Sequence, residues 1–400
     1  MYVPLPPETL TVGVAVPLSI WDAHGELLLR RGEVIVSERH RDLLLQRNPL
    51  VQDEDLRAWN FRYTTELDRM VRNNQSLTKI AGFTRPSELG DRRDDDDNDP
   101  AVVWPDLQTR LTTLLHRNAD AHDFIDRLTR LERRGRALLR LSPDQTLFLL
   151  VQLLFDRRVN YSATHAWLCA VVCQLVGPGG RLPEIEQVAL FRAALTMNIG
   201  MARLHDDLAR QEAPPSEDQR QQILVHPNET VRCLQALGVV DRLWLELVQD
   251  HHEVSGGGGY PAGKRELREA TQLLRMADVF VARISPRHAR SGLLPSVAAR
   301  DIYLGADGKP SAMGAAFVKT LGVYIPGSYV RLVNGEVAVV ARRGPRANAP
   351  TVLSVIGRQG TPLGEPALRD TSDREYEIRG SVPADEVRVR VSAAKLFSRL

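Results

Sequence analysis

The chain has 400 residues, of which 43% are apolar and 26% are charged, and its formal net charge is +2. This length allows two or three globular domains, each with its own core. The near-neutral charge excludes the broad basic surface of a protein that binds a nucleic-acid polymer, so we expect no such partner.

The composition also predicts a compartment. No segment approaches the ~18 uninterrupted apolar residues that a membrane span needs, so we expect no span. The first ten residues have neither the basic start nor the apolar run of a signal peptide, and the chain has only three cysteines. We therefore expect a cytoplasmic location. Cys169 and Cys173 share a face of an apolar helix, and we interpret them as two thiols packed in a core rather than as a redox or metal pair.

The N-terminal part of the chain has the pattern of strands. Short apolar runs in residues 11–35 alternate around turn residues, which predicts a small β-rich module, and a helix follows near residues 37–47. Residues 84–100 combine Pro, Gly and an acidic run that buries too little apolar surface to order itself, so we predict a solvated linker. We place the β-rich module with its helix at 1–62, and a further helix with the acidic linker at 63–104.

From residue 105 the apolar residues recur at three and four positions, which is typical of packed helices. The predicted helical segments are 106–141 (one helix or a pair), 142–155, 163–177, 183–200, 226–238, 241–253 and 269–284. Residues 315–365 have a β-like pattern, with Asn-Gly between two apolar runs as a hairpin signal. We therefore predict a mainly α fold, with a helical bundle core at 105–310 and a small β-rich extension at 311–400.

Candidate metal ligands recur along these helices, and several of them can point into one crevice between packed helices. They are His165, His226, His251, His252 and Asp278. Imidazole and carboxylate groups suit zinc, iron or manganese, and a site with more than one ion is best suited to hydrolysis of a phosphate ester. The glycine run beside them allows backbone N–H groups to approach a phosphate, so we predict substrate binding by Gly257, Gly258, Gly259, Tyr260 and Pro261. On spacing alone, a flexible loop and ordinary core histidines are the commoner interpretation.

A resemblance strengthens the metal hypothesis. The sequence HHEVSGGGGYP at 251–261 resembles the signature of HD-GYP domains, helical metal-dependent phosphodiesterases that hydrolyse cyclic di-GMP in bacteria. The segments that carry His165, His226 and Asp278 resemble the ligand segments of that family in order and spacing. The resemblance covers about residues 160–330. It implies an HD-domain-like helical bundle core and the β-rich extension that often follows it.

The chain departs from the family at the motif that gives it its name. Where the family has His-Asp-Ile-Gly-Lys, residues 197–201 read Met-Asn-Ile-Gly-Met. The resemblance implies that the missing histidine ligates one metal, that the missing aspartate bridges two, and that the missing lysine contacts the substrate phosphate. The Met197 thioether is a poor ligand for hard ions, Asn198 lacks the charge that holds two dications together, and Met201 offers no cation. Gly256 also replaces the family's usual aspartate.

This departure leaves the two metal positions unequal. The first keeps His165 and Asp278, which are too few ligands. The second keeps His226, His251 and His252, and we expect it to hold one divalent ion (iron, manganese or zinc) at partial occupancy, because each lost ligand typically costs about 10–100-fold in affinity or activity.

The pair His205-Asp206 repeats the lost dipeptide eight residues later. A shift of eight residues is about 12 Å along a helix, and we expect Gly200 to end the preceding helix. We therefore interpret His205-Asp206 as a surface pair in a loop, and Arg203 as a solvated loop cation rather than a replacement for the lost lysine.

These features predict a degenerate HD-GYP protein that acts in signalling by binding cyclic di-GMP or a protein partner, for example a GGDEF-type protein. No catalytic residue is assigned, because Met197, Asn198 and Met201 occupy the degenerate positions. An alternative is a residual phosphodiesterase with one ion at the second position and water oriented by Glu253. A second alternative is an interaction scaffold that binds neither metal nor nucleotide.

Overall fold

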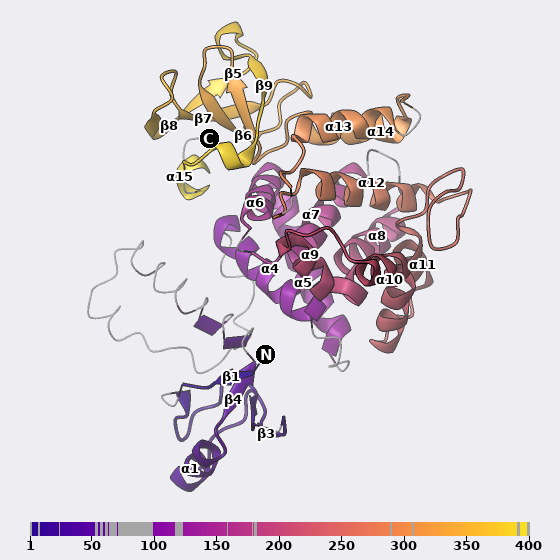
Figure 1. Cartoon of the computed structure of the whole chain (residues 1–400). Helices are drawn as coiled ribbons and strands as arrows, with labels where there is room; N and C mark the ends of the chain where they lie inside the picture. The colour runs from indigo at the N-terminus through magenta and orange to yellow at the C-terminus, as the bar shows by residue number, and fades with distance from the viewer. Residues whose placement is uncertain are drawn as a thin grey trace. The chain divides into compact units, whose positions relative to one another are not determined.

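The structure, a computed structural model, describes most of the chain and divides it into two compact units, Met1–Asn98 and Asp99–Leu400 (Figure 1). The described residues are 2–6, 9–23, 25–52, 55–56, 59–60, 63, 70, 99–116, 123–157, 159–177, 179, 182–288, 290–305, 308–389 and 393–397. The predicted acidic linker at 84–100 lies outside them, except for its last two residues.

The first unit contains a small antiparallel sheet and a helix, as the alternating pattern predicts. Its strands pair in the order β1-β4-β2-β3 and are β1 (Tyr2–Pro4), β2 (Ile20–Trp21), β3 (Leu27–Leu29) and β4 (Leu50–Gln52). Helix α1 (Glu38–Gln46) begins after Ser37, whose side chain accepts a hydrogen bond from the N–H of His40. Buried Leu18, Ile20, Ile35 and Val51 belong to a core of this unit.

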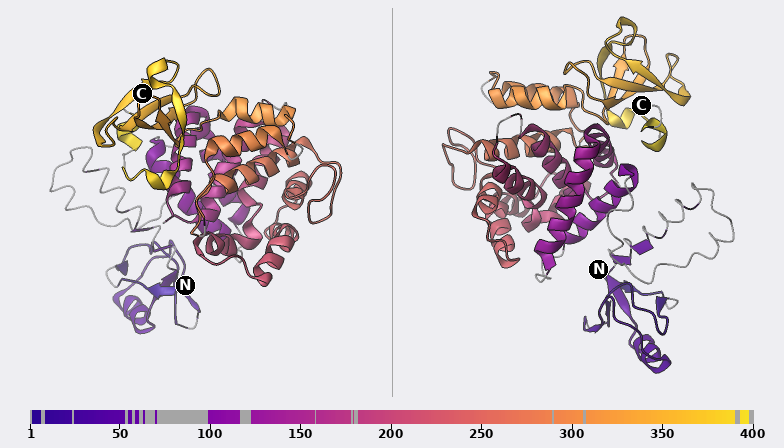
Figure 2. Two further views of the ribbon diagram at one scale, coloured as in Figure 1. Left: turned by 45° about the horizontal axis from the view of Figure 1, so that its top comes forward. Right: turned by 180° about the vertical axis from the view of Figure 1, so that it is seen from behind.

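The second unit is built around a helical bundle. Its helices are α4 (Pro100–His116), α5 (Phe124–Leu141), α6 (Pro143–Phe155), α7 (Tyr161–Val176), α8 (Glu184–Thr196), α9 (Ala202–Arg210), α10 (Glu217–Ala236), α11 (Arg242–Asp250), α12 (Glu269–Ile284), α13 (Pro295–Leu304) and α14 (Ala312–Leu321). Helix α7 is buried along nearly its whole length and packs against α4, α6, α8, α9 and α12 (Figures 1 and 2). A helix that is apolar all round belongs inside a bundle, so α7 is the central element. The prediction of a mainly α fold is confirmed.

A five-stranded antiparallel sheet completes the second unit. The strands pair in the order β8-β7-β6-β5-β9 and are β5 (Tyr329–Leu332), β6 (Val337–Arg342), β7 (Thr351–Ile356), β8 (Pro362–Asp370) and β9 (Ile378–Val382). The predicted Asn-Gly turn joins β5 to β6, and Gly335 has the positive φ of 93° that such a turn requires. Val339 and Leu353 belong to the same core as the bundle, and α15 (Ala393–Phe397) places the Phe397 ring 5.0 Å from that of Phe148 in α6.

One boundary of the β-rich region was predicted wrongly. Residues 315–321, expected to be β-like, belong to helix α14. The Ser311 side chain accepts a hydrogen bond from the N–H of Gly314 and thereby caps the helix, and the buried side chains of Phe317 and Leu321, four residues apart, lie on one helix face. Among the described residues, no single helix is long and apolar enough to cross a membrane; α5 and α6 reach those limits only as a pair, which is bent by 119°.

Candidate metal centre

The structure brings the five predicted metal ligands close together; four of them are buried and His252 is half-buried. Helix α7 contributes His165, α10 contributes His226, the turn after α11 contributes His251 and His252, and α12 contributes Asp278. Each of these elements packs against at least one of the others, so residues up to 113 positions apart in the sequence become neighbours. Their atoms fall into two groups.

The first group consists of the imidazoles of His226, His251 and His252, whose potential ligand atoms lie within 4.8 Å of one another. The Nδ1 of His226 is 2.5 Å from the carbonyl oxygen of Ile223, and the Nδ1 of His251 is 2.6 Å from that of Val248. Because a carbonyl oxygen only accepts, each Nδ1 carries the proton and donates it. The two Nε2 atoms, which are 3.2 Å apart, therefore face each other with their lone pairs.

The protonation of this pair decides what can lie between the two nitrogens. Burial, reinforced by the nearby charge of His252, lowers the pKa of His226 to about 4. Burial, followed by the charges of His252 and His226, lowers the pKa of His251 well below its usual value. Both rings are then neutral at pH 7, and a cation is the group that satisfies two opposed lone pairs. Metal ligands commonly use the second ring nitrogen in this way, so the donor set fits a divalent ion.

The second group consists of His165, Asp278 and Cys169, whose thiol was expected to be packed in the core rather than to serve as a ligand. The Nε2 of His165 is 2.9 Å from Oδ1 of Asp278 and 3.4 Å from Sγ of Cys169. The sequence contains one signal for this contact, because Cys169 follows His165 by four residues and so lies on the same face of α7. Asp278 also links the two groups, with Oδ2 3.9 Å from Nδ1 of His252.

The charges in the second group are shifted by burial and by each other. Burial alone would raise the pKa of the Asp278 carboxyl, but the hydrogen bond from His165 and the charge of that ring outweigh it and hold the pKa well below its usual range. Burial, and then the charge of Asp278, raise the pKa of the Cys169 thiol well above its usual value. Without an ion, this group therefore holds a carboxylate beside a protonated thiol.

The motif at 197–201 forms the turn between α8 and α9. Met197 and Asn198 are buried after the end of α8, and the 3-10 turn η3 (Ile199–Met201) follows. The N–H of Gly200 donates to Oγ1 of Thr230, one helical turn beyond His226 on α10, and a Cβ on Gly200 would lie 2.8 Å from that atom. The turn thus packs tightly on a ligand helix, yet it contributes neither an imidazole nor a carboxylate to the groups described above.

The interpretation of His205-Asp206 as a surface pair in a loop is wrong. Both residues lie in helix α9 and are buried, with 6% and 1% of their surface exposed. The Asp206 carboxylate accepts hydrogen bonds from the N–H of Ser162 (2.7 Å) and its hydroxyl (3.0 Å), and it lies 2.8 Å from Nε2 of His116. Because Ser162 is in the first turn of α7, Asp206 caps the N-terminus of the helix that carries His165.

His205 is the inward-facing residue that the loop interpretation missed. Its ring packs edge-on against His165, with centroids 5.2 Å apart, and against Tyr161, at 4.6 Å. Its Nδ1 is buried and has no hydrogen-bond partner within the described part of the chain. Arg203 is exposed, as predicted, but it lies in helix α9 rather than in a loop and donates to the carbonyl oxygen of His116.

The family model described as HD domain matches residues 127–308, the segment that supplies all five predicted ligands. We call this segment the HD domain, after the family model that it matches. The recognition of the segment from its motifs is therefore confirmed.

Known proteins similar to the HD domain include two phosphodiesterases. The cyclic di-GMP phosphodiesterase PA4108 of Pseudomonas aeruginosa is 28% identical over 188 residues, which are 46% of this chain and 44% of that protein. The 3'3'-cGAMP-specific phosphodiesterase 3 of Vibrio cholerae is 26% identical over 140 residues, which are 34% of this chain and 30% of that protein. The matches thus span less than half the length of either relative. A solved structure, Bd1817, an HDG"Y"P protein from Bdellovibrio bacteriovorus, has a TM-score of 0.45 and 16% identity over 79% of this chain and 98% of that one.

The loop of the HD domain at 254–264 lies against the first group of ligands. Tyr260 stacks on His252, with ring centroids 4.6 Å apart and an interplanar angle of 22°. Gly256, Gly257 and Gly258 have φ values of 92°, 94° and 89°, which only glycine adopts readily. The N–H groups of Gly256 and Gly257 donate to the carbonyl oxygens of Arg265 and Val254, so these two glycines shape the loop and their N–H groups are not free for a phosphate.

Glu253 holds this loop in place. Its carboxylate is buried and accepts hydrogen bonds from the N–H groups of Ala262 (2.6 Å), Gly263 (3.0 Å) and Lys264 (2.9 Å). Both carboxylate oxygens are therefore engaged with the backbone. We assign Glu253 to positioning the loop rather than to orienting a water.

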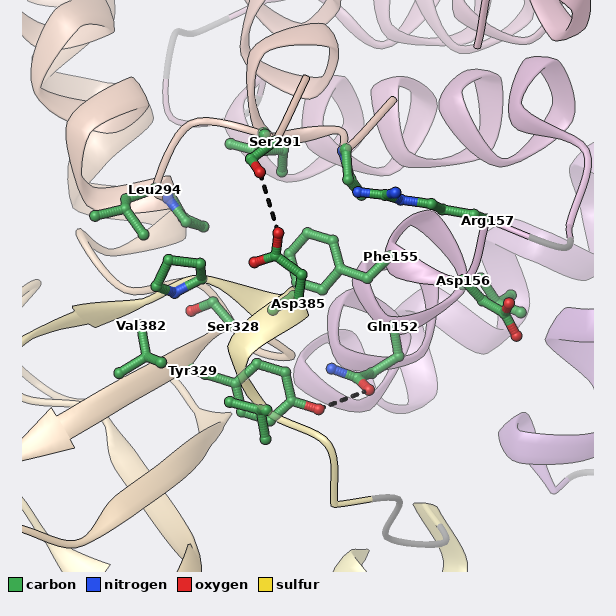
Figure 3. A pocket seen from close by; sticks show the side chains of 18 of the residues that line it. Gln152, Phe155, Asp156, Arg157, Ser291, Leu294, Ser328, Tyr329, Val382 and Asp385 are labelled. Carbon is green, nitrogen blue, oxygen red and sulfur yellow. Dashed lines mark hydrogen bonds between the residues drawn. The ribbon is translucent and has the colours of Figure 1, made fainter. Parts of the chain in front are cut away.

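A separate cavity of about 460 Å³ lies between α6, the segment after α12 and the C-terminal sheet (Figure 3). Two hydrogen bonds cross it, from Ser291 to Asp385 and from Tyr329 to Gln152. None of the predicted metal or substrate residues lines it.

The buried histidines predict that the metal-free HD domain loses stability in mild acid. The pKa of His226 is about 4 in the folded state and about 6.5 when unfolded. Between these values the unfolded chain binds more protons, so the free energy of unfolding rises with pH and falls as acid is added. His226 alone should cost about 2 kcal/mol between pH 7 and pH 5. Urea unfolding in chelator at both pH values measures this loss, and the His226→Gln variant should show a shallower pH dependence. An equal dependence in the variant would contradict the assignment.

Proposed function

We propose that the HD domain is a regulator that binds a cyclic dinucleotide, with cyclic di-GMP as the first candidate, and does not hydrolyse it by a two-metal mechanism. The observation that carries this proposal is the composition of the ligand groups. Asp278 is the one carboxylate among the described ligand atoms of both groups, and the turn at 197–201 adds no other. Two neighbouring dications bring four positive charges, and a hydrolytic pair relies on shared anions to hold them together.

The second metal position has a role in the proposed binding. His226, His251 and His252 would hold one divalent ion, which supplies positive charge for a phosphate oxygen. Tyr260, stacked on His252, gives a flat surface beside that position for a nucleobase or ribose. The similarity of the HD domain to two cyclic dinucleotide phosphodiesterases supports the ligand class. A protein partner such as a GGDEF-type protein stays a prediction from the sequence resemblance.

Arg275 is our candidate for the cation that Met201 no longer supplies. It lies on α12, three residues before Asp278. Burial lowers the pKa of His252, and the charge of Arg275 adds to this effect while Asp278 opposes it. Burial and Asp278 raise the pKa of Tyr260, and the charge of Arg275 opposes that rise. Its Nε is buried and has no hydrogen-bond partner among the residues that the structure describes. A guanidinium held beside the loop and the second metal position is suited to a phosphate.

Calorimetry with cyclic di-GMP, with and without Mn²⁺, tests the proposal. We expect binding without conversion to a linear product, and we expect Arg275→Gln to weaken binding about 10-fold, the value of one charge-assisted hydrogen bond. Arg283→Gln is the matched control, because Arg283 lies on the same helix but pairs with Asp301 at 2.9 Å. Hydrolysis of cyclic di-GMP that the His252→Ala variant abolishes would contradict the proposal and favour a one-metal phosphodiesterase. Absence of any nucleotide binding would leave an interaction scaffold.

A further inference from the structure

The group formed by His165, Cys169 and Asp278 has the donors of a metal site of its own. The three potential ligand atoms lie within 4.8 Å of one another, and all three residues are buried. His165 and Cys169 are one helical turn apart on α7, and Asp278 reaches them from α12, so two packed helices fix the arrangement. The Nε2 of His165 is 2.9 Å from Oδ1 of Asp278, with which it shares a hydrogen bond, and 3.4 Å from Sγ of Cys169.

These separations are close to those of a tetrahedral zinc site. With bonds of about 2.0–2.3 Å to nitrogen, oxygen and sulfur, the ligand atoms of such a site lie about 3.3–3.8 Å apart. The nitrogen–sulfur distance falls in this range. The nitrogen–oxygen distance is shorter because these two atoms share a hydrogen bond, and an ion that replaced the bond would move them apart by a few tenths of an ångström.

The donor types also select the ion. One thiolate, one imidazole and one carboxylate suit zinc or another soft or borderline ion, whereas a thiolate is a poor ligand for Mg²⁺ or Mn²⁺. The sequence resemblance leaves only His165 and Asp278 at this position, so the thiolate is an addition of this chain. It supplies a negative charge of the kind that the motif at 197–201 no longer offers.

A second observation beside the group points to an absent ligand. The His205 ring lies against His165 with its centroid 5.2 Å away, and its Nδ1 is buried without a partner within the described residues. Buried polar atoms in folded proteins are almost always satisfied, and an unpartnered one needs an explanation such as an ion or an ordered water. An ion at the neighbouring group, with a water as its fourth ligand, would supply a hydrogen-bond partner for this nitrogen.

We propose that His165, Cys169 and Asp278 form a thiolate zinc site that replaces the first metal position of the HD domain. Binding breaks the S–H bond of Cys169, forms the sulfur–metal bond, and releases one proton to solvent. The site serves to fix α7 against α12. The site does not depend on nucleotide binding, so an experiment can contradict it without contradicting the proposed function.

Cobalt substitution tests this site without any measurement of catalysis. Co²⁺ added to the full-length, metal-free protein should produce a near-ultraviolet thiolate-to-cobalt absorption band, and one equivalent of Zn²⁺ should abolish it. Cys169→Ser should remove the band and weaken zinc binding at this site about 10–100-fold or more. Cys173→Ser is the matched control, because Cys173 lies one turn further on α7 and is equally buried; it should keep the band.

The control variants also separate this proposal from the second metal position. The double variant His226→Ala, His251→Ala should keep the band, because neither histidine belongs to the thiolate group. A protein that binds Co²⁺ without the band, or a band that persists unchanged in Cys169→Ser, would overturn the proposal. Nucleotide binding measured on the same samples reports on the proposed function alone.

Discussion

Restoring the lost motif with Met197→His, Asn198→Asp and Met201→Lys together is expected to raise cyclic di-GMP hydrolysis at least 100-fold and to add a hard divalent ion to each chain. Each metal ligand or supporting group is typically worth about 10–100-fold in affinity or activity, and the variant returns three at once. The turn that carries them packs against α10 through the contact between Gly200 and Thr230. Metal analysis of the purified protein and product formation with Mn²⁺ measure the two effects.

The single variant Asn198→Asp is the control for charge alone. It is nearly isosteric and returns an anion without the second imidazole, so we expect tighter metal binding with little turnover. If the folded triple variant gained neither metal nor turnover, the turn at 197–201 would no longer face the crevice. The backbone of this turn, and not only its three side chains, would then differ from a metal-binding arrangement.

The sequence predicts the helical fold well because the periodicity of its apolar residues reports directly on burial. The sequence predicts a helix at 163–177 and the structure has α7 at Tyr161–Val176, because a predominantly apolar helix fits the centre of a bundle. The same composition leaves the role of Cys169 without a clear signal. Because α7 has apolar residues on every side, no polar face shows which side borders the ligands, so only the four-residue spacing from His165 indicates the contact.

The wrong predictions lie where a residue that usually ends a helix is followed directly by another helix. Gly200 was expected to lead into a loop, but the chain makes one 3-10 turn and starts α9 at Ala202. The position of His205-Asp206 therefore depends on how η3 packs against α10, which is a tertiary contact with no local signal. The assignment of a second metal group to His226, His251 and His252 was made from motif order, and it stays a prediction until metal is measured.

The role of Asp206 yields the largest predicted effect on stability. Asp206→Ala should lower the free energy of unfolding by about 3–5 kcal/mol, the usual cost of removing one partner from a buried charged network. The truncation leaves the N–H and hydroxyl of Ser162 unsatisfied inside the protein, and it removes the carboxylate beside His116. Asp207→Ala is the matched control, because the Asp207 side chain is exposed. This variant should change the free energy of unfolding by no more than about 0.5 kcal/mol.

The same variant connects stability to the metal groups. Because Asp206 caps the N-terminus of α7, its loss should loosen the first turn of the helix that positions His165 and Cys169. We therefore expect Asp206→Ala to weaken the cobalt–thiolate band as well as to destabilise the fold. Asp206→Asn keeps one acceptor oxygen, so its effects should lie between those of Asp206→Ala and the unchanged protein. Urea unfolding and cobalt titration on the same proteins measure both effects. Equal stability of the Asp206→Ala and Asp207→Ala variants would show that α7 does not rely on this cap, and the ligands of the first position would then be held by the packing of α7 against α12 alone.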